Sequence, residues 1–345
     1  MQGNIAEDDD NERAIYIHLR RLRDGDKYHV KMTSIESSSS LNKRLLNVSP
    51  EHTLKNESES RVYFTMSSQG GVNVNLRKFS MKGVPQDAVV VFIGRRRTGK
   101  STLVRDLLFH HQDIPMGCVI SGTEESNGFF KKIVPPMFIH GEYNPIILAN
   151  FVKRQKLVAQ RLEQDKEKGI RSNIDPRAFI ILDDCMYDDS WTHDKNIRYL
   201  FMNGRHLKVF FIITMQFPLG IQPALRTNVD YTFILREPYM NNRRRLFENY
   251  GAAFPSFEFF CQMMDQCTQN YECLVINNTT QSNKMEDMIF WYKAEIHGDF
   301  KLGAPDLWRQ SEMMARMKEE EDINQYDPRA NMRLRGPAIN VQKRY

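Results

Sequence analysis

The sequence predicts an α/β protein built on a mostly parallel β-sheet with helices on both faces. Short apolar runs recur along residues 81–304, helix-like segments alternate with them, and a glycine-bounded loop joins the first run to the first helix. Strands that are apolar on both faces belong in a sheet that helices cover on each side. The 345 residues are enough for one large domain with extensions, or for two domains.

The individual elements are expected in a regular order. Runs rich in β-branched and aromatic residues predict strands at residues 89–93, 117–121, 138–140, 179–182, 209–214, 231–235 and 288–292. Apolar side chains at helical spacing, or dense charge on a solvated face, predict helices at residues 101–110, 146–168 and 194–203.

The chain divides into three expected parts. Residues 1–80 read as an N-terminal extension, partly disordered or with a small β-rich element: residues 62–66 and 72–79 alternate as strands do, and residues 14–23 predict a strand or a short helix with a basic face. Residues 81–304 form the core domain, and residues 305–345 a helical segment with a basic tail. The tail is either a solvated terminus or a nucleic-acid contact.

Net charge and cysteine content limit the partners and the cellular compartment that the sequence predicts. A formal net charge of +5 permits a nucleic-acid partner without requiring one. Five cysteines without a C-x-x-C pair indicate reduced, buried thiols in a cytosolic protein, with no metal at Cys261, Cys267 and Cys273. No apolar run is long enough for a membrane span, and the acidic N-terminus does not resemble a secretory or mitochondrial leader.

A phosphate-binding loop is predicted after the first strand. The stretch V-V-V-F-I-G-R-R-R-T-G-K-S-T matches G-x-x-x-x-G-K-[ST] in the required context. The glycines allow backbone N–H groups to approach phosphate, Lys100 offers charge to the β- and γ-phosphates, and Ser101 offers a hydroxyl to Mg²⁺. The arginine side chains contact phosphate, contact a neighbour or point to solvent. The expected nucleotide contacts are Gly94, Arg95, Arg96, Arg97, Thr98, Gly99, Lys100, Ser101 and Thr102.

Two acids follow the apolar run F-I-I-L, at the strand end where open α/β sheets bind ligands. Asp183 is predicted to hold Mg²⁺ opposite Ser101, and Asp184 to polarise the attacking water. The alternative is that the two acids cap the next helix or face solvent.

Polar and basic residues complete the expected catalytic set. Gln216 ends the next apolar strand and is predicted to lie between the γ-phosphate and water, with Thr214 as the alternative. Positive charge on the far side of the γ-phosphate often comes from a neighbouring subunit. Arg205 and Arg226 are the candidates for that charge, and each is otherwise a surface charge.

With these residues the chain resembles the virion DNA-packaging ATPases of the nucleocytoplasmic large DNA viruses, the poxvirus-type branch of the FtsK/HerA superfamily. Between about residues 83 and 303, the phosphate loop is followed by I-I-L-D-D-C-M-Y-D with Trp191, L-F-M-N-G-R-H-L-K-V-F-F-I-I-T-M-Q, G-I-Q-P-A-L-R-T-N-V-D-Y-T-F-I-L-R-E, and W-Y-K-A with F-K-L-G. The superfamily usually has Asp-Glu where this chain has Asp183-Asp184, so the second carboxylate reaches less far.

The resemblance implies a RecA-like P-loop NTPase core in a homo-oligomeric ring that uses ATP and Mg²⁺ to drive double-stranded DNA into a procapsid. It implies capsid or portal-vertex proteins as partners, and the host cytoplasm (the virus factory) and the virion as locations. Lys100 and Ser101 then bind phosphate and Mg²⁺, Asp183 is the metal-side acid, Gln216 the sensor, and Arg205 the trans-acting finger, with Arg226 second.

Other function classes fit parts of this pattern. A P-loop nucleoside or nucleotide kinase, another DNA-dependent ATPase, and a nucleotide-gated assembly protein with weak turnover are the alternatives. Gln216 after a long apolar strand favours the motor over a kinase. The complete set of Lys100, Asp183, Asp184 and Gln216 argues against a protein that only binds nucleotide.

Overall fold

The computed structural model describes residues 76–185, 191 and 193–325, together with four short strands before them. These strands form two antiparallel pairs, β1 (Ile15–Arg21) with β2 (Tyr28–Ser34), and β3 (Phe64–Met66) with β4 (Val72–Val74). The acidic N-terminus, the residue 37–40 serine run and the basic tail lie outside the described residues.

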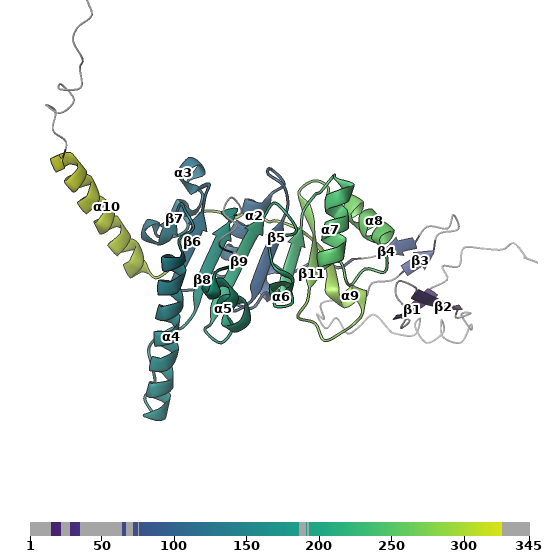
Figure 1. Cartoon of the computed structure of the whole chain (residues 1–345), viewed down its shortest axis with the longest axis horizontal. Coiled ribbons are helices and arrows are strands. Elements are labelled where there is room, and N and C mark those ends of the chain that lie inside the picture. Colours follow the sequence, from purple (N-terminus) through teal and green to yellow (C-terminus); the bar gives the residue numbers. More distant parts are fainter. Residues whose placement is uncertain are drawn as a thin grey trace, which may run out of the picture.

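An eight-stranded sheet forms the centre of the protein, in the order β12-β11-β10-β5-β9-β8-β6-β7 (Figure 1). Neighbouring strands from β10 to β7 in this order are parallel to each other. Strand β11 runs antiparallel to both of its neighbours, β10 and β12. The prediction of a mostly parallel sheet is therefore confirmed. The strands are β5 (Val89–Ile93), β6 (Gly117–Ser121), β7 (Ile139–His140), β8 (Ala178–Asp183), β9 (Val209–Met215), β10 (Tyr231–Ile234), β11 (Glu272–Asn277) and β12 (Ile289–Lys293).

The helices connect and cover these strands, and α4 and α10 project beyond the sheet (Figure 1). No helix or strand is predicted between residues 236 and 287, where the structure has α7, α8, β11 and the start of α9. The α-helices are α2 (Lys100–Phe109), α3 (Glu124–Asn127), α4 (Pro145–Glu167), α5 (Lys195–Asn203), α6 (Pro223–Arg226), α7 (Met240–Tyr250), α8 (Phe257–Cys267), α9 (Met285–Met288) and α10 (Pro305–Gln325).

Alternate residues of β5 point into two separate cores. Val89, Val91 and Ile93 pack in one apolar cluster with residues of α4, α5, α7 and α8. Val90 and Phe92 pack in the other cluster, with the inward face of α2. Because both faces of the strand are buried, every position in it is apolar, and no alternation of apolar and polar residues is seen.

Residues 77–79 extend the sheet at its antiparallel edge. The N–H of Phe79 donates to the carbonyl of Trp291 at 2.9 Å, and the N–H of Trp291 donates to the carbonyl of Arg77 at 3.2 Å. The ring of Phe79 packs against Tyr231 and Phe233 of β10. These contacts place residues 77–79 with the core domain, just before the boundary that the sequence analysis draws at residue 81.

None of the helices in the described ranges is both long and apolar enough to cross a membrane. All five cysteines are free thiols. Burial raises the pKa of Cys118 and of Cys185 to about 12, so these thiols stay protonated.

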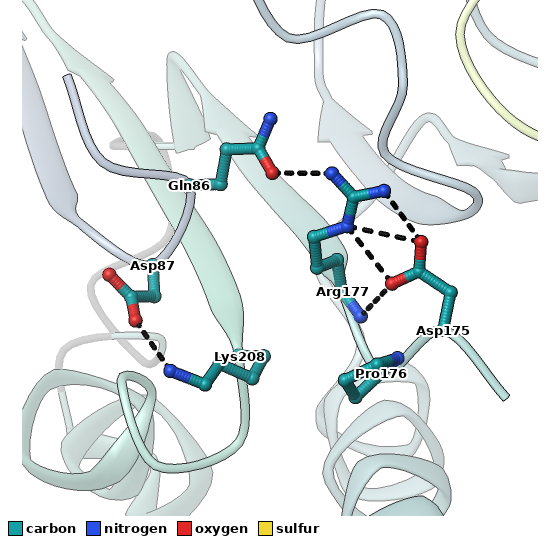
Figure 2. Close-up of a pocket in the computed structure, with 6 residues that line it drawn as sticks. All are labelled: Gln86, Asp87, Asp175, Pro176, Arg177 and Lys208. Carbon is teal, nitrogen blue, oxygen red and sulfur yellow. Dashed lines mark hydrogen bonds and ion pairs between the residues drawn. The ribbon is translucent and has the colours of Figure 1, made fainter. Parts of the chain in front are cut away.

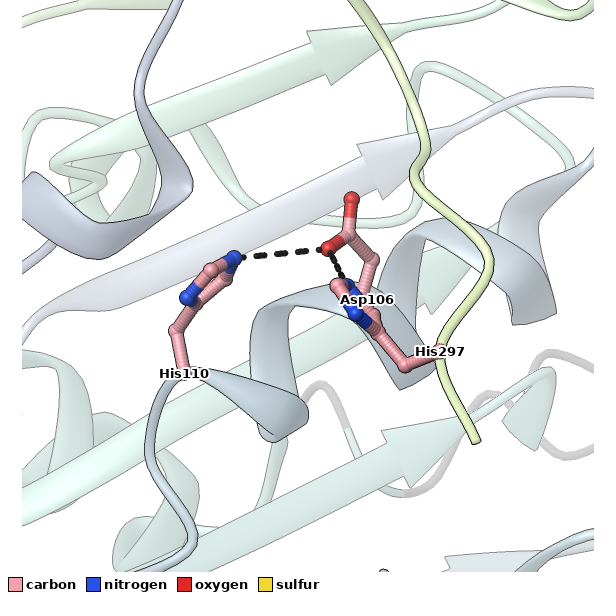
Figure 3. A group of neighbouring side chains, drawn as sticks. All are labelled: Asp106, His110 and His297. Carbon is pink, nitrogen blue, oxygen red and sulfur yellow. Dashed lines mark hydrogen bonds and ion pairs between the residues drawn. The ribbon is translucent and has the colours of Figure 1, made fainter. Parts of the chain in front are cut away.

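A buried carboxylate attaches α2 to the chain that follows β12 (Figure 3). Asp106 is fully buried and accepts hydrogen bonds from the Tyr292 hydroxyl at 2.6 Å, from the backbone N–H of Glu295 at 2.9 Å and from His297 Nε2 at 2.6 Å. The His297 ring stacks on Phe109 at a centroid distance of 3.7 Å. Because α2 begins at the phosphate loop, this cluster holds the helix in place behind it.

We predict that Asp106→Asn lowers the free energy of unfolding by about 3 kcal/mol, because a neutral amide replaces an acceptor that satisfies several buried donors. Urea unfolding measures the change. The matched control is Asp299→Asn, since Asp299 pairs with Arg105 of the same helix but is fully exposed, and little change is expected there. Equal effects of the two substitutions would contradict the anchoring role of Asp106.

Candidate nucleotide-binding site

The phosphate loop leaves β5 at Gly94 and enters α2 at Lys100. A Cβ on Gly94 would lie 2.7 Å from Leu235 Cβ and 2.8 Å from Thr98 Oγ1, so only glycine fits. Gly99 has φ 102°, a conformation open to glycine. The Thr98 hydroxyl donates to the carbonyl of Arg95 at 2.7 Å and closes the turn. Contacts within the loop and with Leu235 therefore fix the loop conformation.

Lys100 is buried within this loop, at 7 % exposure. Its Nζ donates to the carbonyl of Gly94 at 2.7 Å and lies 3.8 Å from Asp184 Oδ1. Burial holds the pKa of Lys100 below its usual value, while the charges of Asp184 and Asp183 act in the opposite direction. The side chain thus links the loop to Asp184 at the end of β8, two strands away from β5 in the sheet.

Asp183 lies in a row with two hydroxyl residues on adjacent strands. Ser121 of β6 and Thr214 of β9 are its register partners on either side. Thr214 Oγ1 donates to Asp183 Oδ1 at 2.7 Å, and Ser121 Oγ donates to Asp183 Oδ2 at 2.8 Å. Burial raises the pKa of Asp183, and both hydroxyl groups oppose that rise by stabilising the charged form.

Asp184 follows β8 with a left-handed backbone conformation, φ 49°. Its backbone N–H donates to Thr214 Oγ1 at 3.1 Å, and its Oδ2 accepts from Gln216 Nε2 at 2.9 Å. Oδ1 is buried and, within the described ranges, has no hydrogen-bond partner. Asp194, and not this acid pair, caps the next helix, α5. The two acids and the glutamine therefore face the loop lysine.

The other loop residues lie at the surface. Ser101 and Thr102 are exposed in the first turn of α2. Arg96 and Arg97 are also exposed. The guanidinium of Arg95 stacks over the ring of Tyr239, 4.6 Å from its centroid. The three arginines, which are alike in the sequence, thus differ in the structure.

Arg205 and Arg226 lie away from this group. Arg205 precedes β9 and pairs with Asp230, just before β10, at 2.7 Å. Both residues lie at the amino ends of parallel strands, whereas the phosphate loop lies at the carboxyl ends. Arg226 hydrogen-bonds Asn249 and lies over the ring of Tyr250. Within the described residues, neither arginine contacts Lys100, Asp184 or Gln216.

Two contacts of the site were not predicted from the sequence: the hydrogen bond of Ser121 to Asp183 and the stacking of Arg95 on Tyr239. Thr214 is predicted as an alternative sensor, whereas the structure shows that its hydroxyl bridges Asp183 and the Asp184 backbone. A usable signal for Ser121 exists, because G-C-V-I-S ends in a polar residue at the same strand end as the acid pair. The Tyr239 contact has no comparable signal, because Tyr239 lies far from Arg95 along the chain.

A surface pocket lies at the amino ends of the parallel strands, opposite the phosphate loop (Figure 2). Its lining residues precede β5, β8 and β9. Arg177 is held there by Gln86, Asp175 and Asp113, and Lys208 Nζ pairs with Asp87 at 3.0 Å. Since these charges neutralise one another, the pocket contributes no group to the phosphate loop.

Fold and site together define the class of protein. A single strand, β9, separates the phosphate-loop strand β5 from the acidic strand β8, and the glutamine follows that middle strand. This is the arrangement of the RecA-like P-loop NTPases.

Relatives identify the family more closely. The chain is 37% identical over 233 residues to uncharacterized protein L437 of Acanthamoeba polyphaga mimivirus, which covers 67% of this chain and 81% of that protein. It is 41% identical over 234 residues to uncharacterized protein 075L of Invertebrate iridescent virus 6, covering 67% and 86%. The chain therefore belongs to the family that contains these two viral proteins. No family model matches it.

Solved structures resemble the chain more distantly. Genome packaging NTPase B204 from Sulfolobus turreted icosahedral virus 2, in complex with AMPPCP, is 16% identical with a TM-score of 0.43, covering 61% of this chain and 100% of that one. The pCW3 conjugation coupling protein TcpA is 13% identical with a TM-score of 0.42, covering 81% and 77%.

We predict that Thr214→Val lowers the free energy of unfolding by about 1–3 kcal/mol, because it leaves the Asp184 N–H and one oxygen of buried Asp183 without the hydroxyl. Denaturant titration measures the change. Thr232→Val is the matched control, since Thr232 is equally buried in β10 and its hydroxyl has no partner in the described part of the chain. If Thr232→Val destabilises the protein as much, the Thr214 bridge is not the cause.

Proposed function

We propose that this protein is an ATPase that uses nucleotide hydrolysis to move double-stranded DNA into a viral procapsid. One observation carries the enzymatic part of the proposal. Lys100 of α2, Asp184 after β8 and Gln216 after β9 meet beside the phosphate loop, with Lys100 Nζ 3.8 Å and Gln216 Nε2 2.9 Å from the Asp184 carboxylate. A protein that only bound nucleotide would not need the acid and the amide there.

The arrangement supports hydrolysis through this chain's own groups. Backbone N–H groups of the loop and the Lys100 ammonium bind the phosphates. Asp184 Oδ1 is a buried acceptor without a hydrogen-bond donor among the described residues, so it suits the proton of an attacking water. Gln216 already holds the other oxygen of Asp184 and thereby orients both groups toward the γ-phosphate.

The donor set also fits Mg²⁺. Asp183 offers a buried carboxylate whose pKa is raised by burial, and a divalent cation would stabilise its charged form. Ser101 adds an exposed hydroxyl in the first turn of α2. Each Asp183 oxygen accepts one hydroxyl donor and keeps a further lone pair. A bound Mg²⁺ would neutralise charge on the phosphates during transfer.

The DNA part of the proposal has separate support. The relatives L437 and 075L are proteins of a mimivirus and of an iridescent virus. The motifs from Asp183 to Glu237 resemble those of packaging ATPases. A packaging motor must accept any sequence, so we expect contacts with DNA phosphates, sensitivity to salt, and a ring of subunits around the duplex. Capsid or portal-vertex partners and sites of action in the virus factory and virion complete the proposal.

We predict that duplex DNA stimulates ATP hydrolysis, and that Asp184→Asn reduces turnover about 10²–10⁴-fold with ATP binding largely kept, because the amide cannot accept the water proton. Phosphate release and equilibrium nucleotide binding measure the two effects. Asp87→Asn is the matched control, since Asp87 only pairs with Lys208 at the opposite sheet edge.

Two results would contradict this proposal. Undiminished turnover in Asp184→Asn would remove Asp184 as the base. Hydrolysis unaffected by DNA, together with phosphate transfer to a nucleoside, would favour a P-loop kinase. Lys100→Ala should abolish nucleotide binding or turnover, and thus gives the background for both assays.

We further predict that Arg205 acts in trans. Its side chain is 63% exposed at the amino ends of the strands, opposite its own phosphate loop, where a neighbouring subunit can meet it. Mixing Arg205→Ala with Lys100→Ala subunits should restore activity above the sum of the separate variants, because an intact loop then meets an intact arginine. The same mixing with Arg226→Ala compares the second candidate. No recovery with Arg205→Ala would exclude it as the finger.

A further inference from the structure

Two exposed tyrosines lie beside the phosphate loop on the side away from the acids. β10 pairs with β5, Ile234 opposite Ile93, and β11 pairs with β10, Leu274 opposite Ile234. Because β11 is antiparallel, its first residues lie at the same sheet edge as the last residues of β5 and β10. Tyr239, shortly after β10, and Tyr271, immediately before β11, are therefore brought to the loop.

Tyr271 lies next to Gly99 of the phosphate loop. A Cβ built on Gly99 would lie 3.5 Å from Tyr271 Cδ1. Tyr271 is nevertheless 68% exposed, among the largest exposures of any apolar side chain described. The solvent-exposed face of this ring can stack on another planar group.

The backbone fixes this ring in place. Asn270 and Tyr271 have φ of 51° and 64°, in the left-handed region that residues other than glycine rarely adopt. The Glu272 N–H donates to the carbonyl of Gln269 at 2.8 Å, and Gln269 Nε2 donates to the carbonyl of Asp265 at 2.6 Å. Strained conformations of this kind persist where the surroundings determine them, and they gather at ligand sites.

Tyr239 is placed differently. Its backbone N–H donates to buried Glu237 at 3.0 Å, and the Arg95 guanidinium stacks over its ring. Tyr239 therefore positions a loop arginine. Within the described ranges, Tyr271 has no such cation or ring over it, so its face is the one available for stacking.

The direction of a bound nucleotide follows from the sheet order. The γ-phosphate end faces Asp183, Asp184 and Gln216, on β8 and β9, to one side of β5. The nucleoside must then leave the loop toward the other side, over β10 and β11. That is the side on which Tyr271 lies against Gly99.

We propose that Tyr271 is the platform on which the nucleobase stacks. This inference rests on the proposed binding of a nucleoside triphosphate to the loop and adds the site for its base. Stacking uses the π-face that every base has, so the ring contributes affinity without selecting a base by hydrogen bonds. Inorganic tripolyphosphate, which has the phosphates and no base, should not use it.

The test compares two ligands on the full-length chain by calorimetry, AMPPNP and inorganic tripolyphosphate, both with Mg²⁺. Tyr271→Ala is expected to weaken AMPPNP binding about tenfold and to leave tripolyphosphate binding within about twofold. Tyr271→Phe keeps the ring and should match the unsubstituted protein. The substitutions are at an exposed position, so folding is expected to be retained.

Tyr239→Ala is the neighbouring control, and it should affect both ligands alike because Tyr239 acts through Arg95. Equal weakening of both ligands by Tyr271→Ala would mean that the ring only supports the loop, and would overturn the proposal. Unchanged AMPPNP binding would overturn it as well. If the unsubstituted protein binds neither ligand, the proposed nucleotide-dependent function fails together with it.

Discussion

The candidate site depends on one hydrogen-bonded row across three parallel strands. Ser121, Asp183 and Thr214 are register partners on β6, β8 and β9, and both hydroxyl groups donate to the carboxylate between them. Burial raises the pKa of Asp183, and both hydroxyl donors oppose that rise by stabilising the charged carboxylate. The same Thr214 hydroxyl accepts from the Asp184 backbone and thus sets the position of the second acid. The parallel register of the sheet is therefore also the geometry of the site.

The polar side chains at the carboxyl ends of the parallel strands differ from those at the amino ends. At the carboxyl edge, Lys100 is separated from Asp184 by 3.8 Å, too far for a strong ion pair, and Asp184 Oδ1 has no donor among the described residues. At the amino edge, Arg177, Lys208 and Arg205 are each paired with acids. The carboxyl end of the strands thus keeps one buried carboxylate oxygen beside Lys100 without a hydrogen bond, whereas these three basic side chains at the amino end are paired.

Elements with a single strong pattern were predictable, and those that depend on partners were not. The strands at residues 89–93 and 117–121 match β5 and β6 because they are apolar on both faces. Helix α7 escaped prediction because its sequence M-N-N-R-R-R-L-F-E-N-Y has few apolar residues, and it is stabilised by Leu246 in the core and by Arg243 bound to Asp265. Strand β11 is an exception, because its run C-L-V-I is apolar on both faces like β5 and β6 and was nevertheless not predicted.

By itself, the sequence determined the phosphate loop, the acid pair and the glutamine, because each lies directly after an apolar run and local order sets its place. Only the tertiary structure decided which groups meet. It separated the loop arginines, placing Arg95 on Tyr239, and it brought Tyr271 to Gly99 from more than 170 positions along the chain. It also placed Arg205 at the far edge of the sheet. These contacts follow from strand order and register, which hydrogen bonding between distant segments establishes and no local spacing records.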